Sequence, residues 1–164
     1  MRRIPSGFTM VEMMAVLAVI AILSLLALPT YLDRIAREQV TGALPLADVA
    51  KKPIAEIWAL LQVMPEDNKA AGIPAPEKIV NNYVSSLTVR NGAIDLKFGN
   101  RAGKAIQEKT LTLRPAVVED EPQVPVAWVC GYAEPPSPMK LLGTDSTSVP
   151  QEYLPLECRS LGRK

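Results

Sequence analysis

Residues 7–32 read GFTMVEMMAVLAVIAILSLLALPTYL, and this stretch decides the fold class of the chain. From Met13 to Leu32 it holds twenty residues without a formal charge. As an α-helix, a segment of that length rises by about 30 Å, which matches the hydrocarbon core of a bilayer. Arg2 and Arg3 precede it, so the positive-inside tendency predicts a cytoplasmic amino terminus and a body beyond the membrane.

A cleaved secretory signal is the alternative interpretation of a basic start followed by an apolar run. Such a signal needs small residues at a cleavage site after the run. Here the run ends Leu28-Pro29-Thr30-Tyr31-Leu32, without that pattern. Neither interpretation accounts for Glu12, since a carboxylate in an apolar helix costs about 3 kcal/mol at the bilayer centre. Either Glu12 lies in the first helical turn, where free N–H groups favour an anion, or it has a dedicated cationic partner.

The composition argues against several classes of function. The chain has 164 residues, enough for one domain and an appendage. Its net charge of +1 does not favour nucleic-acid binding, which usually needs a strongly basic surface. It has no histidine, which removes Ser–His and Cys–His catalysis and histidine-bound metals. Two cysteines do not make a cysteine-only zinc site. We therefore expect no catalytic residue, no metal and no cofactor.

The rest of the chain is predicted to form an α+β head. Residues 31–64 have helical apolar spacing with one bend near Gly42–Pro45, and residues 64–76 read as a surface loop. Two alternating runs flank Asn91-Gly92, which is the strongest short hairpin signal. With two later runs this predicts four antiparallel strands against one face of the helix. The four runs are Val84–Arg90, Ala93–Phe98, Thr110–Arg114 and Val124–Cys130.

Three other features favour structural roles over chemical ones. Trp58 falls on the apolar side of the predicted helix, which favours a core position over a ligand contact. Residues 99–104 contain glycine and lysine but lack the pattern of a phosphate-binding loop, which favours a connection between strands. The acidic run Glu119-Asp120-Glu121 favours a solvated loop, with a weak calcium site or a paired-carboxylate site as the alternatives.

The amino-terminal sequence carries a family resemblance. The basic leader, then Gly7-Phe8-Thr9-Met10-Val11-Glu12 and the apolar run, closely resemble the class III signal of type IV pilins and the related pseudopilins. The resemblance implies a type IVa-like prepilin whose leader, residues 1–7, is cut by a prepilin peptidase between Gly7 and Phe8. It implies N-methylation of Phe8 by the same enzyme family, pairing of Glu12 with the terminal ammonium of a neighbouring subunit, and a helix break at Pro29 in the assembled fibre.

Cys130 and Cys158 bracket a stretch rich in glycine and proline. If the body lies beyond the inner membrane, its compartment oxidises thiols, and the alternative is two reduced thiols. A bond would close a 29-residue loop, worth about 3.6 kcal/mol in the chain-entropy estimate. The pair resembles the disulfide that bounds the carboxy-terminal loop of type IV pilins, so the resemblance implies the bond. Pseudopilins usually lack it, which favours a pilin.

The resemblance implies a structural subunit with no enzymatic activity. Residues 8–32 would be the membrane and assembly half of the helix, and residues 33–164 a periplasmic and later extracellular head. The prepilin would cross the inner membrane once, and the pilus assembly machinery would polymerise it with other copies. The surface fibre would serve attachment, twitching motility or DNA uptake. Two alternatives stay open: a pseudopilin or minor pilin of a secretion or DNA-uptake system, and a bitopic membrane protein with a periplasmic binding domain.

Overall fold

The computed structural model describes residues 7–160 and Gly162, and for residues 26–30 it describes the helical backbone but not the side chains. The chain divides into two compact units at the junction between Arg34 and Ile35. The predicted leader residues Arg2 and Arg3 lie outside the described residues. The second unit contains the sheet and the helical segments that pack on it.

The helical part of the chain is interrupted once, where the sequence predicts a bend. The successive elements are α1 (Met10–Ala43), the 3₁₀ helix η1 (Leu44–Ala47) and α2 (Asp48–Leu61). Pro45 lies at the start of η1, and because proline lacks an N–H donor it breaks the regular helical pattern there. The predicted helix to residue 64 is three residues too long, because Gln62 adopts a left-handed φ of 54° and ends α2.

The sheet contains the four predicted strands and one short strand that the sequence did not predict. Its order is β1-β2-β3-β4 with antiparallel neighbours, and β5 pairs with β3. The hairpin prediction is confirmed, since Asn91 and Gly92 join β1 to β2 with positive φ values of 47° and 81°. The strands are β1 (Val84–Arg90), β2 (Ala93–Phe98), β3 (Thr110–Val117), β4 (Ala127–Cys130) and β5 (Lys140–Leu141).

β3 is longer than predicted and continues through a proline. It extends past Arg114 to Val117, although Pro115 has no N–H for the ladder. The carbonyl of Pro115 accepts a hydrogen bond from the N–H of Leu142 at 2.9 Å. The segment that follows β5 therefore supports β3 at a position where its own sequence argues against a strand.

β4 is shorter than predicted. It begins at Ala127, whereas the alternating pattern begins at Val124. Pro125 lies in the part that is lost, and a proline cannot donate to a neighbouring strand. The sequence pattern located this strand correctly but placed its first residue too early.

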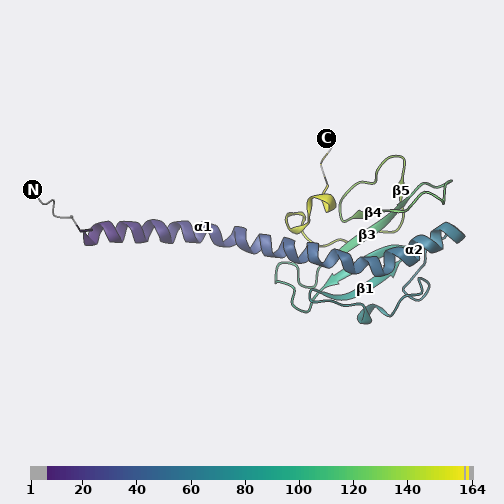
Figure 1. The fold of residues 1–164 in the computed structure, drawn as a ribbon, viewed down its shortest axis with the longest axis horizontal. Helices are drawn as coiled ribbons and strands as arrows, with labels where there is room; N and C mark the ends of the chain where they lie inside the picture. Colours follow the sequence, from purple (N-terminus) through teal and green to yellow (C-terminus); the bar gives the residue numbers. More distant parts are fainter. Residues whose placement is uncertain (1–6, 161, 163–164) are drawn as a thin grey trace, which may run out of the picture. The chain divides into compact units, whose positions relative to one another are not determined.

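The core lies between one face of the sheet and the helices, which cross over the strands in Figure 1. Cross-strand partners such as Leu87, Leu96 and Leu111 lie on this face and are fully buried. The helices oppose these large side chains mostly with small ones, which lets the helix backbone approach the sheet closely. The buried helical residues in this cluster are Ala36, Val40, Ala43, Ala47, Ala50 and Ile54. Trp58 is also buried, as predicted.

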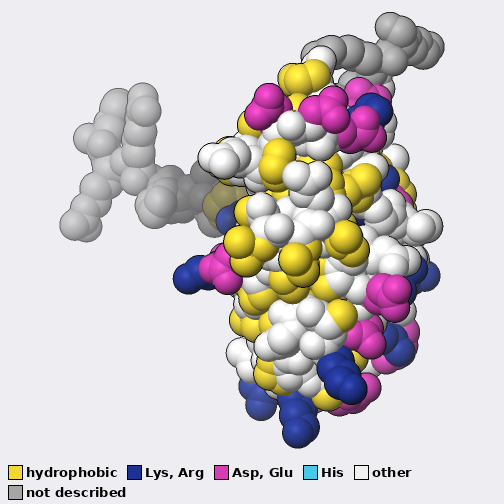
Figure 2. All heavy atoms as spheres, turned by 90° about the vertical axis from the view of Figure 1, so that its right-hand side faces the viewer, with side chains coloured by type: hydrophobic (Ala, Val, Ile, Leu, Met, Phe, Trp, Pro, Cys, Tyr) yellow, Lys and Arg dark blue, Asp and Glu magenta, His cyan; other side chains and the backbone are white. Residues whose placement is uncertain are grey.

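The end of the head where α2 terminates exposes hydrophobic side chains. Figure 2 looks at this end and shows them gathered in the middle of the face, with acidic and basic side chains toward its edges. Leu60, Leu61 and Val63, at and just beyond the end of α2, are among the exposed large apolar residues. Exposed apolar side chains in such numbers are typical of a surface that contacts other proteins.

Candidate functional site in the amino-terminal helix and the disulfide loop

The predicted cleavage site lies in exposed backbone just before α1. Gly7, Phe8 and Thr9 are not helical, and α1 begins at Met10. A side chain placed on Gly7 would meet nothing within 4 Å, and Phe8 is 75% exposed. The bond between Gly7 and Phe8 is therefore outside the helical hydrogen-bond pattern and open to an approaching protein.

Glu12 and Thr9 cap the first turn of α1 reciprocally. The backbone N–H of Glu12 donates to Thr9 Oγ1 at 3.2 Å, and the backbone N–H of Thr9 donates to Glu12 Oε2 at 3.4 Å. This arrangement is a capping box, which satisfies two N–H groups that the helix leaves free. Sequence reasoning offered the first helical turn as one of two explanations of Glu12 but missed the reciprocal bond, although Thr-x-x-Glu before an apolar run is its signature. In the single chain the carboxylate is thus held beside the amino terminus of α1.

The first unit exposes apolar side chains on all sides of α1. Twelve large hydrophobic residues between Phe8 and Leu25 are between 44% and 86% exposed. Ser24 turns its hydroxyl inward and donates to the Ile20 carbonyl at 2.8 Å, so its polar group is satisfied within the helix. A helix that is hydrophobic all round is normally covered by lipid or by other protein.

Within the part of the chain that the structure describes, no helix is both long enough and apolar enough to cross a membrane. The assignment of residues 8–32 to a membrane segment stays a prediction. α1 continues through the position of Pro29, whose side chain lies outside the described residues. The helix break that the resemblance implies concerns the assembled fibre and also stays a prediction.

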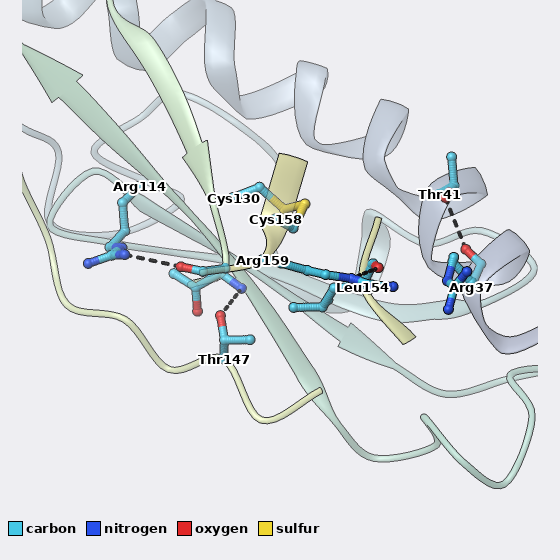
Figure 3. The surroundings of a disulfide bond; sticks show 10 residues. Arg37, Thr41, Arg114, Cys130, Thr147, Leu154, Cys158 and Arg159 are labelled. Atoms are coloured by element: carbon cyan, nitrogen blue, oxygen red, sulfur yellow. Dashed lines mark hydrogen bonds between the residues drawn. A yellow bond between two sulfur atoms is a disulfide. The ribbon is translucent and has the colours of Figure 1, made fainter. Parts of the chain in front are cut away.

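The disulfide bond between Cys130 and Cys158 is present, with a Cα–Cα distance of 4.5 Å (Figure 3). Cys130 ends β4, and Cys158 lies in the 3₁₀ helix η4 (Leu156–Cys158). Both cysteines are buried. Gly131 follows with a φ of 55°, and a Cβ at this position would lie 2.8 Å from the carbonyl oxygen of Cys158. Only glycine fits this close approach of two backbones without strain.

The loop closed by the disulfide is attached to β3 at several points. Near its middle, β5 pairs with the end of β3. Farther along, Ser148 and Thr110 exchange two hydrogen bonds: the Ser148 N–H donates to the Thr110 carbonyl at 2.8 Å, and Ser148 Oγ accepts from the Thr110 N–H at 2.9 Å. The N–H of Thr112 in β3 also donates to Thr147 Oγ1 at 3.1 Å. The loop is therefore part of the folded head.

A polar cluster ties this loop to the sheet face opposite the core. Asp95, only 9% exposed, accepts hydrogen bonds from Arg90 Nε at 2.6 Å and from the Thr112 hydroxyl at 2.7 Å. Thr112 Oγ1 in turn accepts from the Ser146 N–H at 3.0 Å, and Arg90 donates to Ser146 Oγ. The hydrogen bond to Asp95 raises the pKa of the Arg90 guanidinium above its ordinary value. Sequence reasoning missed this cluster, whose signal is the cross-strand register of Asp95 with Thr112.

The remaining predicted segments lie in connections between strands. Residues 99–104 belong to the connection between β2 and β3, as expected. The acidic run from Glu119 to Glu121 is exposed between β3 and β4, and Glu119 forms an ion pair with Lys140. Among the described residues, no three metal-ligating side chains lie together.

Known protein families and individual known proteins match most of the chain. A family model described as pilin (bacterial filament) matches residues 36–159, and one described as prokaryotic N-terminal methylation motif matches residues 2–28. The chain is 33% identical to the type IV major pilin protein PilE1 of Neisseria gonorrhoeae, over 97% of this chain and 89% of that protein. It is 33% identical to the fimbrial protein EcpC of Eikenella corrodens, over 98% and 94% of the two chains. It is 40% identical to the type IV major fimbrial protein FimA of Dichelobacter nodosus, over 69% and 82%.

Proposed function

The chain belongs to the type IV pilin family, and we propose that it is a structural subunit of a type IV pilus with no chemistry of its own. The observation that carries this proposal is the exposed apolar surface of α1 between Phe8 and Leu25, joined to a head that buries its own core. A subunit that polymerises through one helix needs both features in one chain.

The apolar surface is too large to be left in water. Covering twelve large hydrophobic side chains is worth on the order of 20 kcal/mol, more than the 5–15 kcal/mol that holds a typical domain folded. Residues 8–32 hold the precursor in the inner membrane, with the amino terminus in the cytoplasm. Assembly machinery then moves this surface from lipid into a bundle of the same helices from other copies, outside the cell. The side chains have apolar neighbours in both places, so most of the burial energy is kept.

Processing creates the mature amino terminus. A prepilin peptidase cuts between Gly7 and Phe8, and its methyltransferase activity methylates the new amine of Phe8. The open, non-helical backbone at Gly7 supports access by the peptidase, and the match to the methylation motif over residues 2–28 supports the modification.

Glu12 sets the register between subunits. After cleavage the ammonium of Phe8 lies one residue before Thr9, whose N–H already faces the Glu12 carboxylate. In a bundle of apolar helices, an unpaired carboxylate is strongly penalised. Pairing Glu12 with the Phe8 ammonium of a neighbouring copy removes the penalty, and subunits in any other register keep it.

Mass spectrometry of the mature terminus tests the proposal. Protein from sheared surface fibres should begin at Phe8 and carry one methyl group on its amine. In Gly7→Val, a β-branched side chain beside the scissile bond should obstruct the peptidase, so the uncut precursor accumulates and fibres are lost. Ser6→Ala, with its change one residue farther from the bond, serves as the control and should be cut normally. Surface protein that keeps Met1, or normal processing of Gly7→Val, would contradict the assignment.

A further inference from the structure

Three of the six methionines of the chain lie together in the first two turns of α1. Met10, Met13 and Met14 are 86%, 47% and 70% exposed. Positions i, i+3 and i+4 share one side of a helix, so the three thioethers form one surface, which we call the methionine face. At about 100° of rotation per residue, Glu12 falls on the other side of α1.

The two methionines in the head are more protected than the methionine face. Met64 and Met139 are half-buried. A Cβ at Gly92 would lie 2.7 Å from Met64 Sδ, so the hairpin turn covers one side of this sulfur. Met64 and Met139 therefore offer a comparison of the same side chain, in the same molecule, away from the surface that is proposed to polymerise.

The methionine face lies beside a charged group and is therefore close to water before assembly. Met10 and Met14 are each two residues from Glu12, which is about 3 Å along the helix axis. The Glu12 side chain is exposed, and burial of an unpaired carboxylate in an apolar medium is strongly unfavourable. Until Glu12 is paired, a position that keeps its carboxylate hydrated also keeps the neighbouring sulfur atoms near water.

Oxidation would change this face from apolar to polar. When a thioether meets hydrogen peroxide, a sulfur lone pair attacks one peroxide oxygen. The S–O bond forms, the O–O bond breaks and water leaves, so the sulfur is oxidised by two electrons and the peroxide is reduced. The product is a methionine sulfoxide, which is polar and disrupts methionine-rich interfaces.

A bundle of these helices has no free side-chain donor for the new oxygen. Between Met10 and Leu25, Ser24 carries the one side-chain hydroxyl, and its proton already goes to the Ile20 carbonyl at 2.8 Å. In the proposed fibre the Phe8 ammonium is engaged with Glu12. A sulfoxide oxygen buried there stays unsatisfied, which should weaken a subunit contact on the order of tenfold.

We propose that the methionine face is a site of oxidative modification by peroxide, and that its sulfoxides keep a subunit out of the fibre; this rests on the proposed function. In the unoxidised chain the flexible thioethers pack against apolar side chains of neighbouring copies. Oxidation reverses that preference without unfolding the head, because the methionine face lies outside the core cluster of the head. The effect is a supply of assembly-competent subunits that falls as peroxide rises.

The distribution of sulfoxides between membrane and fibre tests the proposal on the full chain. Cells are sheared to remove fibres, exposed briefly to hydrogen peroxide and allowed to grow new fibres. Mass spectrometry of peptides then gives the sulfoxide fraction at each methionine in membrane-bound subunits and in new fibres. We expect sulfoxides of the methionine face to be roughly tenfold rarer in the fibres, whereas Met139 sulfoxide should be equally frequent in both.

Two variants locate the effect. The triple variant Met10→Leu, Met13→Leu, Met14→Leu keeps the volume and the apolar character of the face, and its fibre yield should not respond to peroxide. The matched control Met64→Leu, Met139→Leu keeps the face and should lose fibres as the unmodified chain does. If the triple variant assembles poorly without peroxide, the sulfoxide distribution in the unmodified chain decides the question.

Each other outcome counts against the proposal in a distinct way. Equal sulfoxide fractions in membrane and fibres overturn it and leave the structural subunit standing. A methionine face that stays unoxidised at a dose that oxidises Met139 shows that peroxide does not reach it, and this also overturns the proposal. Equal loss of fibres in the triple variant places the damage elsewhere and overturns the site. A chain absent from the fibres of untreated cells overturns the proposed function, and the methionine face with it.

Discussion

The two stretches of α1 on either side of the Arg34–Ile35 junction differ in how their apolar residues are arranged. Before the junction, the described hydrophobic side chains are exposed around the whole helix. After it, Ala36, Val40 and Ala43 recur at helical spacing and are buried, while the residues between them stay in solvent or at the edge. The second part of the helix therefore packs within the chain, whereas the first part leaves its apolar side chains uncovered, and we propose that other copies cover them. The periodicity of the apolar residues decides which.

The largest expected effect is on assembly and comes from Glu12. Glu12→Ala should insert into the membrane normally, because the change removes a charge from an apolar segment. It should nearly abolish fibres, because breaking a buried ion pair costs about 3–5 kcal/mol at each subunit contact. The yield of sheared fibres, compared with the amount of membrane-bound subunit, measures the effect.

Two matched variants separate the charge of Glu12 from its role as a cap. Glu12→Gln keeps an oxygen that can accept from the Thr9 N–H but removes the charge, so it should assemble as poorly as Glu12→Ala. Thr9→Val removes one bond of the capping box at a cost of about 1 kcal/mol, and it should still form fibres. Normal fibre yield from Glu12→Gln, together with loss in Thr9→Val, would show that Glu12 acts as a helix cap and not as a charge partner.

A smaller effect is expected in the head from loss of the disulfide. The double variant Cys130→Ser, Cys158→Ser frees a 29-residue loop, and the free energy of unfolding should fall by about 3.6 kcal/mol. Urea unfolding of the detergent-solubilised protein, followed by tryptophan fluorescence, measures this. Insertion of the apolar segment should be unchanged. A loss below about 1 kcal/mol would mean that the contacts of the loop with β3 and Asp95 restrain it even when the covalent link is absent.

The smallest expected effect is on the stability of the head, and it is tested by replacing one leucine in each region. Leu96→Ala leaves a cavity under the helices and should lower the free energy of unfolding of the head by about 3 kcal/mol. Leu17→Ala removes the same atoms from an exposed position and should leave the stability of the head unchanged within about 0.5 kcal/mol. The same unfolding experiment serves for both. Equal destabilisation by the two variants would contradict the separation of the two regions.

The features that follow a strong local pattern were predicted from the sequence. The apolar segment, the helix bend at Pro45 and the hairpin at Asn91-Gly92 each depend on residues that are neighbours in the chain. The pairing of Cys130 with Cys158 came from the family resemblance, and the structure confirms it.

Apart from the capping box of Thr9 and Glu12, whose signature is local, the interactions that were missed join residues far apart in the chain. The two residues of β5 are too few for any alternation, and they pair with β3 because the disulfide loop folds back on it. The continuation of β3 through Pro115 has the same cause, since Leu142 supplies the hydrogen bond. The cluster around Asp95 joins two strands and the loop, so it becomes visible once their register is known.

In the assembled fibre, other copies of the chain should cover the apolar surface of α1. A cryo-electron microscopy reconstruction of sheared surface fibres tests it most directly. Residues 8–25 should line the fibre axis, packed against the same residues of neighbouring subunits, with each Glu12 carboxylate beside the Phe8 amine of another copy. A fibre in which this surface faces solvent, or in which Glu12 has no neighbouring amine, would contradict it.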